Sequence, residues 1–482
     1  MLTQSLNTIL TYAIPAVVVL FQAAGILWAV RALFSARSSQ GAIAWIMGLV
    51  IFPYVAVPLY WAFGRDRFVG YVTARRGGCP ELEATRTCFE CVRADLAAHG
   101  PDTAQSLHVL ERLAGMPFTR ANSVTLLKDG LGTFPAIFEA IAQATNYVLV
   151  QFFIIHDDAL GRELKDSLTA KARQGVAVKL LYDAIGSHAL PEAFVRDLRE
   201  AGAEVRAFNT TKRWRNRMQI NFRNHRKIVV VDGHTAFVGG LNVGDEYMGR
   251  NRRFGPWRDT HLRCEGPAAA AVQLAFVEDW YWAKGGVPPL NWDAAPSQNG
   301  RMDVLALPSG PADHLETYSL AFIQCAEAAR ERLWIVSPYF VPDKEIISAL
   351  QLAALRGVDV RVMLPLRPDH RLVHWASFSY FPELSRIGVK FYRYAPGFLH
   401  QKAMLVDSRF ACIGTANCDN RSFRLNFEIT MVMADQEFIQ DVSAMLLEDF
   451  AHCVPATAKD YDERWIGFKA AVKLSRLLSP IL

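Results

Sequence analysis

His225-Arg-Lys-Ile-Val-Val-Val-Asp232 and His400-Gln-Lys-Ala-Met-Leu-Val-Asp407 are two copies of one pattern. In each copy one residue separates a histidine from a lysine, and an aspartate follows. Each copy leads to a glycine-containing turn that ends in asparagine, Asn242 in the first and Asn417 in the second. The asparagine follows the histidine by the same interval both times. Two matching copies predict a single site assembled from two similar halves of the chain.

The similarity extends beyond the motif to whole strand–helix–strand units. Apolar runs flank a helical pattern in both halves, and Gly175 and Gly357 follow the two helices where a C-terminal cap is expected. Such units predict an α/β fold of two similar halves, each a mainly parallel sheet flanked by helices. The expected strand, helix and strand are 147–155, 159–173 and 176–183 in the first half, and 333–339, 344–355 and 358–365 in the second.

Each His-x-Lys segment opens a short apolar strand. Residues alternate on a strand, so the histidine and lysine should share one face and point at one group. Asp232 and Asp407 complete the motifs at the turns that follow, where we expect them to hold the turn or a nearby basic residue.

The N-terminal region is strongly apolar. Hydrophobic residues make up 51% of the 482 residues, and the first 30 residues contain no charged side chain. Residues 8–30 and 41–64 are each long enough to span a bilayer as a helix, and Pro53 and Pro58 are tolerated in a membrane helix. A signal peptide fits poorly, because no basic region precedes the first run. We therefore expect a two-helix transmembrane hairpin.

These patterns divide the chain into four segments and suggest a topology. More arginines follow the second apolar run than lie between the two runs, which favours a cytoplasmic body in a multi-pass membrane protein. A C-terminal helix over 461–482, ending before Pro480, is expected to pack on the body or to lie on the membrane surface. The segments are a hairpin (1–66), a linker (67–105), a first half (106–295) and a second half (296–482).

The net charge of +5 is modest but uneven. Residues 211–227 hold seven Lys or Arg and no acid, and residues 250–258 hold four more. Beside a membrane hairpin these stretches favour anionic lipid headgroups as partners, with nucleic acid the competing reading. The eight cysteines are scattered and are expected to be reduced. Cys88-x2-Cys91 lacks the second ligand pair of a zinc site.

The paired motifs suit cleavage of a phosphodiester. A neutral imidazole can attack phosphorus to form a phosphohistidine, and a second imidazolium can protonate the leaving oxygen. His225 and His400 fit these roles. Lysines and amides stabilise charge on the phosphate oxygens, and the candidates are Lys227, Lys402, Asn242 and Asn417.

A catalytic histidine usually has a carboxylate behind it. Asp259 lies downstream of His225, and Glu428 lies downstream of His400 on a predicted strand. No His, Asp and Glu cluster has metal-ligand spacing, which favours chemistry without a metal or other cofactor. His261 and His370 have no second copy and are interpreted as incidental.

The paired His-x-Lys-x4-Asp motif resembles the phospholipase D superfamily, and further segments are similar to bacterial cardiolipin synthases over nearly the whole chain. Cys418 departs from the pattern, where a bulkier apolar residue is expected. The similar segments are Ala44-Trp45, Phe63-Gly-Arg65, Asp183-Ala-Ile-Gly-Ser187, Ser337-Pro-Tyr-Phe-Val-Pro-Asp343, Gly397–Lys402, Gly414–Glu428 and Leu478–Leu482.

The resemblance implies transfer of a phosphatidyl group from one phosphatidylglycerol to another, with release of glycerol. It also implies that His225 is the nucleophile and His400 the general acid and then base. Four alternatives stay open: a hydrolase giving phosphatidic acid, a synthase using phosphatidylethanolamine as co-substrate, a membrane-tethered nuclease, and a scaffold that binds anionic lipid. Intact histidines, lysines and asparagines argue against the scaffold.

Overall fold

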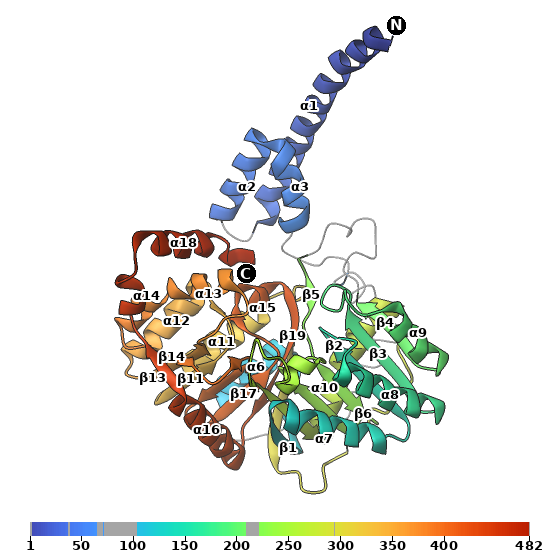
Figure 1. The fold of residues 1–482 in the computed structure, drawn as a ribbon. Helices are drawn as coiled ribbons and strands as arrows, with labels where there is room; N and C mark the ends of the chain where they lie inside the picture. The colour runs from blue at the N-terminus through green and yellow to red at the C-terminus, as the bar shows by residue number, and fades with distance from the viewer. Residues whose placement is uncertain are drawn as a thin grey trace. The chain divides into compact units, whose positions relative to one another are not determined.

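The computed structural model describes residues 2–36, 39–64, 71, 104–208, 221–293 and 295–481. It separates into two compact units. One contains residues 1–70 and 210–222, and the other contains 71–209 and 223–482. The first unit is helical, and the second is the α/β body that carries both motifs (Figure 1).

The N-terminal unit holds three helices, α1 (Leu2–Ser35), α2 (Ser39–Ile51) and α3 (Pro53–Phe63). Within α1, Tyr12–Ser35 is long and apolar enough to cross a membrane. The second expected span differs from its prediction, because the chain breaks at Phe52 into two shorter helices. Pro53 explains the break, since proline restricts the preceding residue and starts helices well.

The three helices pack closely against one another. Ala32, Leu49, Val57 and Tyr60 form part of their shared core. A Cβ atom at Gly25 would lie 2.2 Å from the Leu49 carbonyl oxygen, so glycine lets α1 and α2 approach.

The body is built from the two predicted halves. The helices at 159–173 and 344–355 have the predicted bounds, and the expected strands are present. The first half comprises α6 (Ala104–Ala114), β1 (Thr119–Lys128), α7 (Asp129–Gln143), β2 (Tyr147–Phe152), α8 (Ala159–Arg173), β3 (Ala177–Asp183), α9 (Glu192–Glu200), β4 (Glu204–Phe208), β5 (Arg223–Asn224), β6 (Ile228–Val231), β7 (Thr235–Gly239), η2 (Asp245–Met248), β8 (Trp257–Arg258), β9 (Thr260–Glu265) and α10 (Pro267–Lys284).

The second half repeats the strand–helix–strand units and the motif hairpin of the first, with additional short elements between them and further elements at the C-terminus. It comprises β10 (Met302–Ser309), α11 (Thr317–Ala328), β11 (Arg332–Val336), β12 (Phe340–Val341), α12 (Lys344–Leu355), β13 (Asp359–Pro365), α13 (Arg371–Phe378), α14 (Phe381–Ser385), β14 (Lys390–Tyr394), β15 (Phe398–Leu399), β16 (Ala403–Val406), β17 (Phe410–Gly414), β18 (Cys418–Asp419), α15 (Asn420–Arg424), β19 (Asn426–Met433), α16 (Gln436–Ala451), β20 (Cys453–Ala456), α17 (Lys459–Asp462), α18 (Ile466–Leu477) and η3 (Ser479–Ile481).

One sheet runs through both halves in the order β20-β14-β13-β11-β16-β17-β19-β10-β1-β9-β7-β6-β2-β3-β4. The sheet is mixed, which corrects the mainly parallel sheets expected. Among the described strands of this sheet, β2-β3-β4 and β11-β13-β14 are the runs that are parallel within one half. The motif strands β6 and β16 each form an antiparallel hairpin with the next strand, because the turns after them are short.

The central pair β1 and β10 joins the halves, with helices packed on the outside (Figure 1). Two further short pairings cross between the halves. β5 runs parallel to the start of β19, and β15 runs parallel to β8. Both crossings lie one residue before a motif histidine, so they determine where each histidine sits.

The C-terminal helix α18 packs on the body through Val472, which is buried, and through Phe468, whose ring lies 5.4 Å from that of Phe378. The expected packing on the body is therefore present. The other face of α18 exposes Ile466 and Leu477, so contact with a membrane surface remains a prediction.

Candidate active site

His225 is positioned by the crossing of β5 and β19. Asn224 pairs with Phe427, and the His225 N–H donates to the Phe427 carbonyl at 2.9 Å. The next residue on β19 is Glu428, and its carboxylate lies 2.9 Å from His225 Nδ1. The strand register therefore places the carboxylate behind the imidazole and leaves Nε2 as the reactive nitrogen.

Three further donors hold the Glu428 carboxylate. The Thr415 and Ser422 hydroxyls donate at 2.6 and 2.8 Å, and Asn426 Nδ2 donates at 3.2 Å. Burial alone would raise the pKa of Glu428, but His225, Lys227 and the Thr415 hydroxyl bring the pKa below its ordinary value. Glu428 is therefore ionised despite being fully buried.

His400 has the same arrangement from the opposite direction. β15 runs beside β8, and the His400 N–H donates to the Arg258 carbonyl at 2.8 Å. The residue after Arg258 is Asp259, whose Oδ2 lies 2.7 Å from His400 Nδ1. A Cβ atom at Gly240 would lie 2.1 Å from Asp259 Oδ1, so only glycine leaves room for this carboxylate.

The pairing of histidines with carboxylates is thus crossed between the halves. Asp259 follows His225 in the sequence and Glu428 follows His400, but the sequence does not say which acid serves which histidine. The structure pairs each acid with the histidine of the other half, because β8 pairs with the segment before His400 and β19 pairs with the segment before His225. Neither half contains a complete histidine–carboxylate pair of its own.

Both motif lysines are buried beside the histidines. Lys227 Nζ donates to the carbonyl of His225 at 2.6 Å, and Lys402 Nζ donates to that of His400. Burial lowers the pKa of Lys227 well below its ordinary value and that of Lys402 to about 8. An anionic group between the two ammonium groups would favour their charged forms.

The imidazoles lie in an apolar, aromatic setting. The Phe153 ring lies 5.1 Å from that of His225, and the Trp257 ring lies 5.1 Å from that of His400. Burial lowers the pKa of His225 to about 4, and burial with Lys402 and Lys227 lowers the pKa of His400 well below its ordinary value. Both imidazoles are therefore neutral in the unliganded site at neutral pH.

The two asparagines differ in their surroundings. Asn242 Oδ1 accepts from the Ile154 N–H at 3.2 Å, and its Nδ2 donates to the Tyr247 hydroxyl at 3.2 Å. Asn417 Oδ1 is buried with no hydrogen-bond partner in the described part of the chain. The Asn417 side chain is thus more available to a ligand than that of Asn242.

Asp232 and Asp407 lie at the far ends of the motif strands, roughly 15 Å along the strand from the lysines. Asp232 accepts from the backbone N–H groups of residues 145–147 at 2.7–2.8 Å. Asp407 accepts from those of residues 330–332 at 2.8–3.0 Å. These aspartates tie each turn to the start of the neighbouring strand, so they hold the turns as their position in the motifs predicts.

A second repeated feature, which was not among the sequence-based predictions, holds the middle residue of each motif in place. Asp279 on α10 accepts from Arg226 at 2.9 Å, and Asp449 on α16 accepts from Gln401 at 3.0 Å. Arg226 and Gln401 are the middle residues of the two His-x-Lys motifs. The repeated Glu-Asp-aromatic sequence (278–280 and 448–450) was the signal for these anchors.

The basic stretches are less exposed than expected. Arg226 and Lys227 are buried in the site, and Arg258 is buried against Asp449 and Asp129. Residues 211–220 and the Cys88-x2-Cys91 pair lie outside the described residues. Arg252 and Arg253 are exposed and remain candidates for lipid contact.

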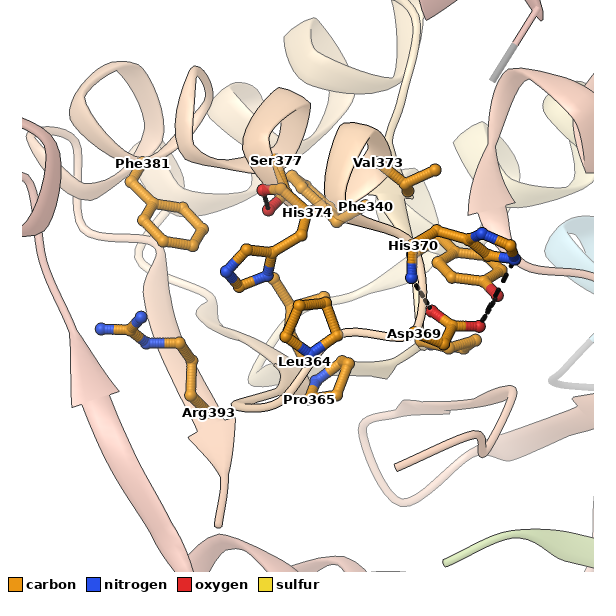
Figure 2. Close-up of a pocket in the computed structure, with 13 residues that line it drawn as sticks. Phe340, Leu364, Pro365, Asp369, His370, Val373, His374, Ser377, Phe381 and Arg393 are labelled. Carbon is orange, nitrogen blue, oxygen red and sulfur yellow. Dashed lines mark hydrogen bonds and ion pairs between the residues drawn. The ribbon is translucent and has the colours of Figure 1, made fainter. Parts of the chain in front are cut away.

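The other predictions concern metals and unduplicated histidines. No group of three or more His, Cys, Asp or Glu side chains gathers as a metal site within the described residues. Neither ring nitrogen of the buried His261 has a hydrogen-bond partner in that part of the chain. His370 lines a pocket together with Tyr339 and Asp369 (Figure 2).

Comparisons with known proteins give consistent results. A family model described as "Cardiolipin synthase, PLD-like domain" matches residues 137–255 and 322–450, and one described as "Phospholipase_D-nuclease N-terminal" matches 23–65. "Cardiolipin synthase A" of Pseudomonas fluorescens (strain SBW25) is 50% identical over 461 residues, 95% of this chain and 96% of that protein. Its counterpart in Pseudomonas putida (strain W619) is 48% identical over the same shares.

A solved structure shares the fold. Phosphatidylserine synthase of Haemophilus influenzae Rd KW20 aligns with a TM-score of 0.61 at 14% identity, covering 78% of this chain and all of the other. At this identity the likeness concerns the fold alone.

Proposed function

Because the chain belongs to the cardiolipin synthase family of phospholipase D-like proteins, we propose that it transfers a phosphatidyl group between two phosphatidylglycerol molecules through a phosphohistidine. The products are cardiolipin and free glycerol. One phosphodiester replaces another, so the reaction needs no further energy source.

In the first step His225 Nε2 attacks the phosphorus of one phosphatidylglycerol. The P–N bond forms as the bond from phosphorus to the glycerol oxygen breaks, and His400 delivers a proton to that oxygen. Glu428 holds the Nδ1 proton of His225 and stabilises the positive charge that develops on the ring. The two lysines stabilise the equatorial oxygens.

His400 must carry a proton to act as the acid. Lys402 and Lys227 contribute to its lowered pKa. A bound phosphodiester adds a negative charge beside these lysines and offsets their effect, while Asp259 stabilises the imidazolium. Substrate binding therefore prepares the general acid.

In the second step a headgroup hydroxyl of another phosphatidylglycerol attacks the phosphohistidine. His400 takes the hydroxyl proton, the new O–P bond forms and the P–N bond breaks. The site returns to its starting protonation state with cardiolipin bound.

The observation that carries the proposal is the pair of buried, crossed histidine–carboxylate contacts, His225 with Glu428 and His400 with Asp259. This arrangement supplies one nucleophile and one acid–base group to the same site. A scaffold that only binds lipid would have no use for it.

The test is product analysis on the full chain purified in detergent. Given phosphatidylglycerol with a metal chelator present, the protein should form cardiolipin and glycerol, and His225→Ala should form neither. His234→Gln, at an exposed position outside the site, is the matched control and should retain activity. Phosphatidic acid as the main product would instead identify a hydrolase, and a requirement for phosphatidylethanolamine would change the co-substrate.

We further propose that the protein is a multi-pass protein of the bacterial inner membrane with the catalytic body in the cytoplasm, where it contacts anionic lipids. The apolar α1 and the arginine-rich sequence after α3 support this orientation. Alkaline phosphatase fused to the C-terminus should be inactive in cells, and an active fusion would reverse the topology.

A further inference from the structure

A pocket with a mostly apolar lining and a few polar side chains lies beside the connection between β13 and β14. This connection holds two helices, α13 and α14, whereas the matching connection of the first half holds α9 alone. Figure 2 shows Asp369 and His370 at one end of the pocket and Phe381 and Arg393 at the other. The pocket therefore belongs to the second half and breaks the symmetry of the site.

The strand pairings bring this pocket close to the motif residues. Phe340 pairs with Cys418, so the preceding Tyr339 lies beside Asn417. Ser337 Oγ reinforces the contact by accepting from the Cys418 N–H at 2.9 Å.

Asp369 reaches the site from the other side. It lies in the loop after β13, and β13 itself contacts β15, the strand that leads into His400. Its charge acts on both His400 and Lys402. The Asp369 end of the pocket thus adjoins the general acid.

Two hydrogen bonds orient the Asp369 carboxylate, and they leave part of its capacity to accept hydrogen bonds unfilled. It accepts from the Tyr339 hydroxyl at 2.5 Å and from the His370 N–H at 2.7 Å. Its side chain remains 18% exposed, so further lone pairs face the pocket and can accept from a ligand.

The rest of the pocket suits a neutral polyol. Burial and Arg393 lower the pKa of His374 to about 4, so this imidazole is neutral. Arg393 Nε is a buried N–H with no hydrogen-bond partner among the described residues. The Arg393 guanidinium also forms an ion pair with Asp460 through Nη2, so its Nε–H is the part left for a ligand. One carboxylate, one N–H donor and a neutral imidazole match the mixed donors and acceptors of neighbouring hydroxyl groups.

We propose that this pocket binds the glycerol headgroup of the acceptor lipid and that Asp369 and Tyr339 select it by accepting and ordering hydrogen bonds from its hydroxyls. The inference rests on the proposed phosphatidyl transfer and names the specificity residues for its second step. His400 protonates the leaving oxygen in the first step and deprotonates the attacking oxygen in the second. The departing glycerol therefore occupies the same subsite as the acceptor headgroup.

The test exploits the shared intermediate. Full-length protein in detergent micelles receives phosphatidylglycerol and a fixed concentration of ethanol, an alcohol without a second hydroxyl. Cardiolipin, phosphatidylethanol and phosphatidic acid all arise from one phosphohistidine, so their ratio is independent of the donor step. The ratio therefore reports recognition of the acceptor alone.

Asp369→Asn should lower the ratio of cardiolipin to phosphatidylethanol about tenfold, the effect of losing one hydrogen bond to a charged group. Tyr339→Phe should shift the ratio in the same direction by a smaller factor. Arg367→Gln, an exposed position in the same loop that does not line the pocket, should leave the ratio unchanged.

An unchanged ratio in Asp369→Asn, with cardiolipin still made by the unmodified protein, would overturn the inference. If Asp369→Asn loses all products, the ratio in Tyr339→Phe decides in the same way. Failure of the unmodified protein to make any cardiolipin would instead refute the proposed function.

Discussion

Replacing each buried carboxylate by its amide separates the roles of the two crossed pairs. Asp259→Asn and Glu428→Gln keep the side-chain shape but remove the charge behind His400 and His225, respectively. If His400 is the general acid, Asp259→Asn weakens protonation of the leaving oxygen. If His225 is the nucleophile, Glu428→Gln weakens the attack itself.

The magnitude follows from what each step requires. General acid catalysis contributes about 10²–10⁴-fold, so Asp259→Asn should slow cleavage of phosphatidylglycerol within that range. A phosphatidyl ester of p-nitrophenol leaves without a proton, so the same variant should lose less than about tenfold on it. Glu428→Gln should slow both substrates by about 10²–10⁴-fold, because Glu428 orients the nucleophile in each case.

The assay is single-turnover release of the leaving group with protein in excess over substrate in micelles. Absorbance follows nitrophenolate, and a coupled assay follows glycerol. Thermal unfolding of each variant controls for loss of structure, and His225→Ala and His400→Ala provide the reference patterns. Asp259→Asn should behave like His400→Ala: both should be slow on phosphatidylglycerol and close to normal on the phosphatidyl ester of p-nitrophenol. If it instead behaves like His225→Ala, the crossed assignment of carboxylates is wrong.

Further predictions concern pH and the backbone near the site. The pKa of His225 is about 4, so kcat/KM should fall below pH 4 as the nucleophile gains a proton. At higher pH kcat/KM should also fall as free His400, whose pKa lies well below its ordinary value, loses the proton that the general acid needs, and again above pH 8 as Lys402, with a pKa of about 8, loses its charge; an acidic limb near pH 6.5 would contradict the burial of His225. Gly240→Ala should lower activity at least about tenfold, because its Cβ would displace Asp259 from His400. Gly132→Ala, in α7 with no atom within 4 Å of the added Cβ, should keep activity and stabilise the protein slightly; equal losses in both variants would contradict the role of Gly240.

Much of the fold could be predicted from local patterns. The bounds of α8 and α12 follow from amphipathic periodicity and from the glycines that end them, and the motif strands follow from apolar runs after each lysine. The direction of the strands could not be predicted as well. Strand–helix–strand units imply parallel pairs, but antiparallel pairs, among them the hairpins that follow the motif lysines, outnumber the parallel ones and make the sheet mixed.

The second apolar run shows a different limit. Its composition indicates one long span, but Pro53 divides it into α2 and α3. Hydropathy measures how favourably a segment enters an apolar environment. The end of the helix is decided instead by Pro53, which lacks an N–H to donate and restricts the backbone of the preceding Phe52.

By itself, the sequence determined the site residues, since the same His-x-Lys pair occurs twice, as His225 with Lys227 and as His400 with Lys402. Only the tertiary structure decided which carboxylate serves which histidine. Distance along the chain pairs each acid with the histidine before it, but hydrogen bonding between strands acts across the interface of the two halves. β5 beside β19 and β15 beside β8 exchange the partners, so the catalytic groups exist only when both halves have folded together.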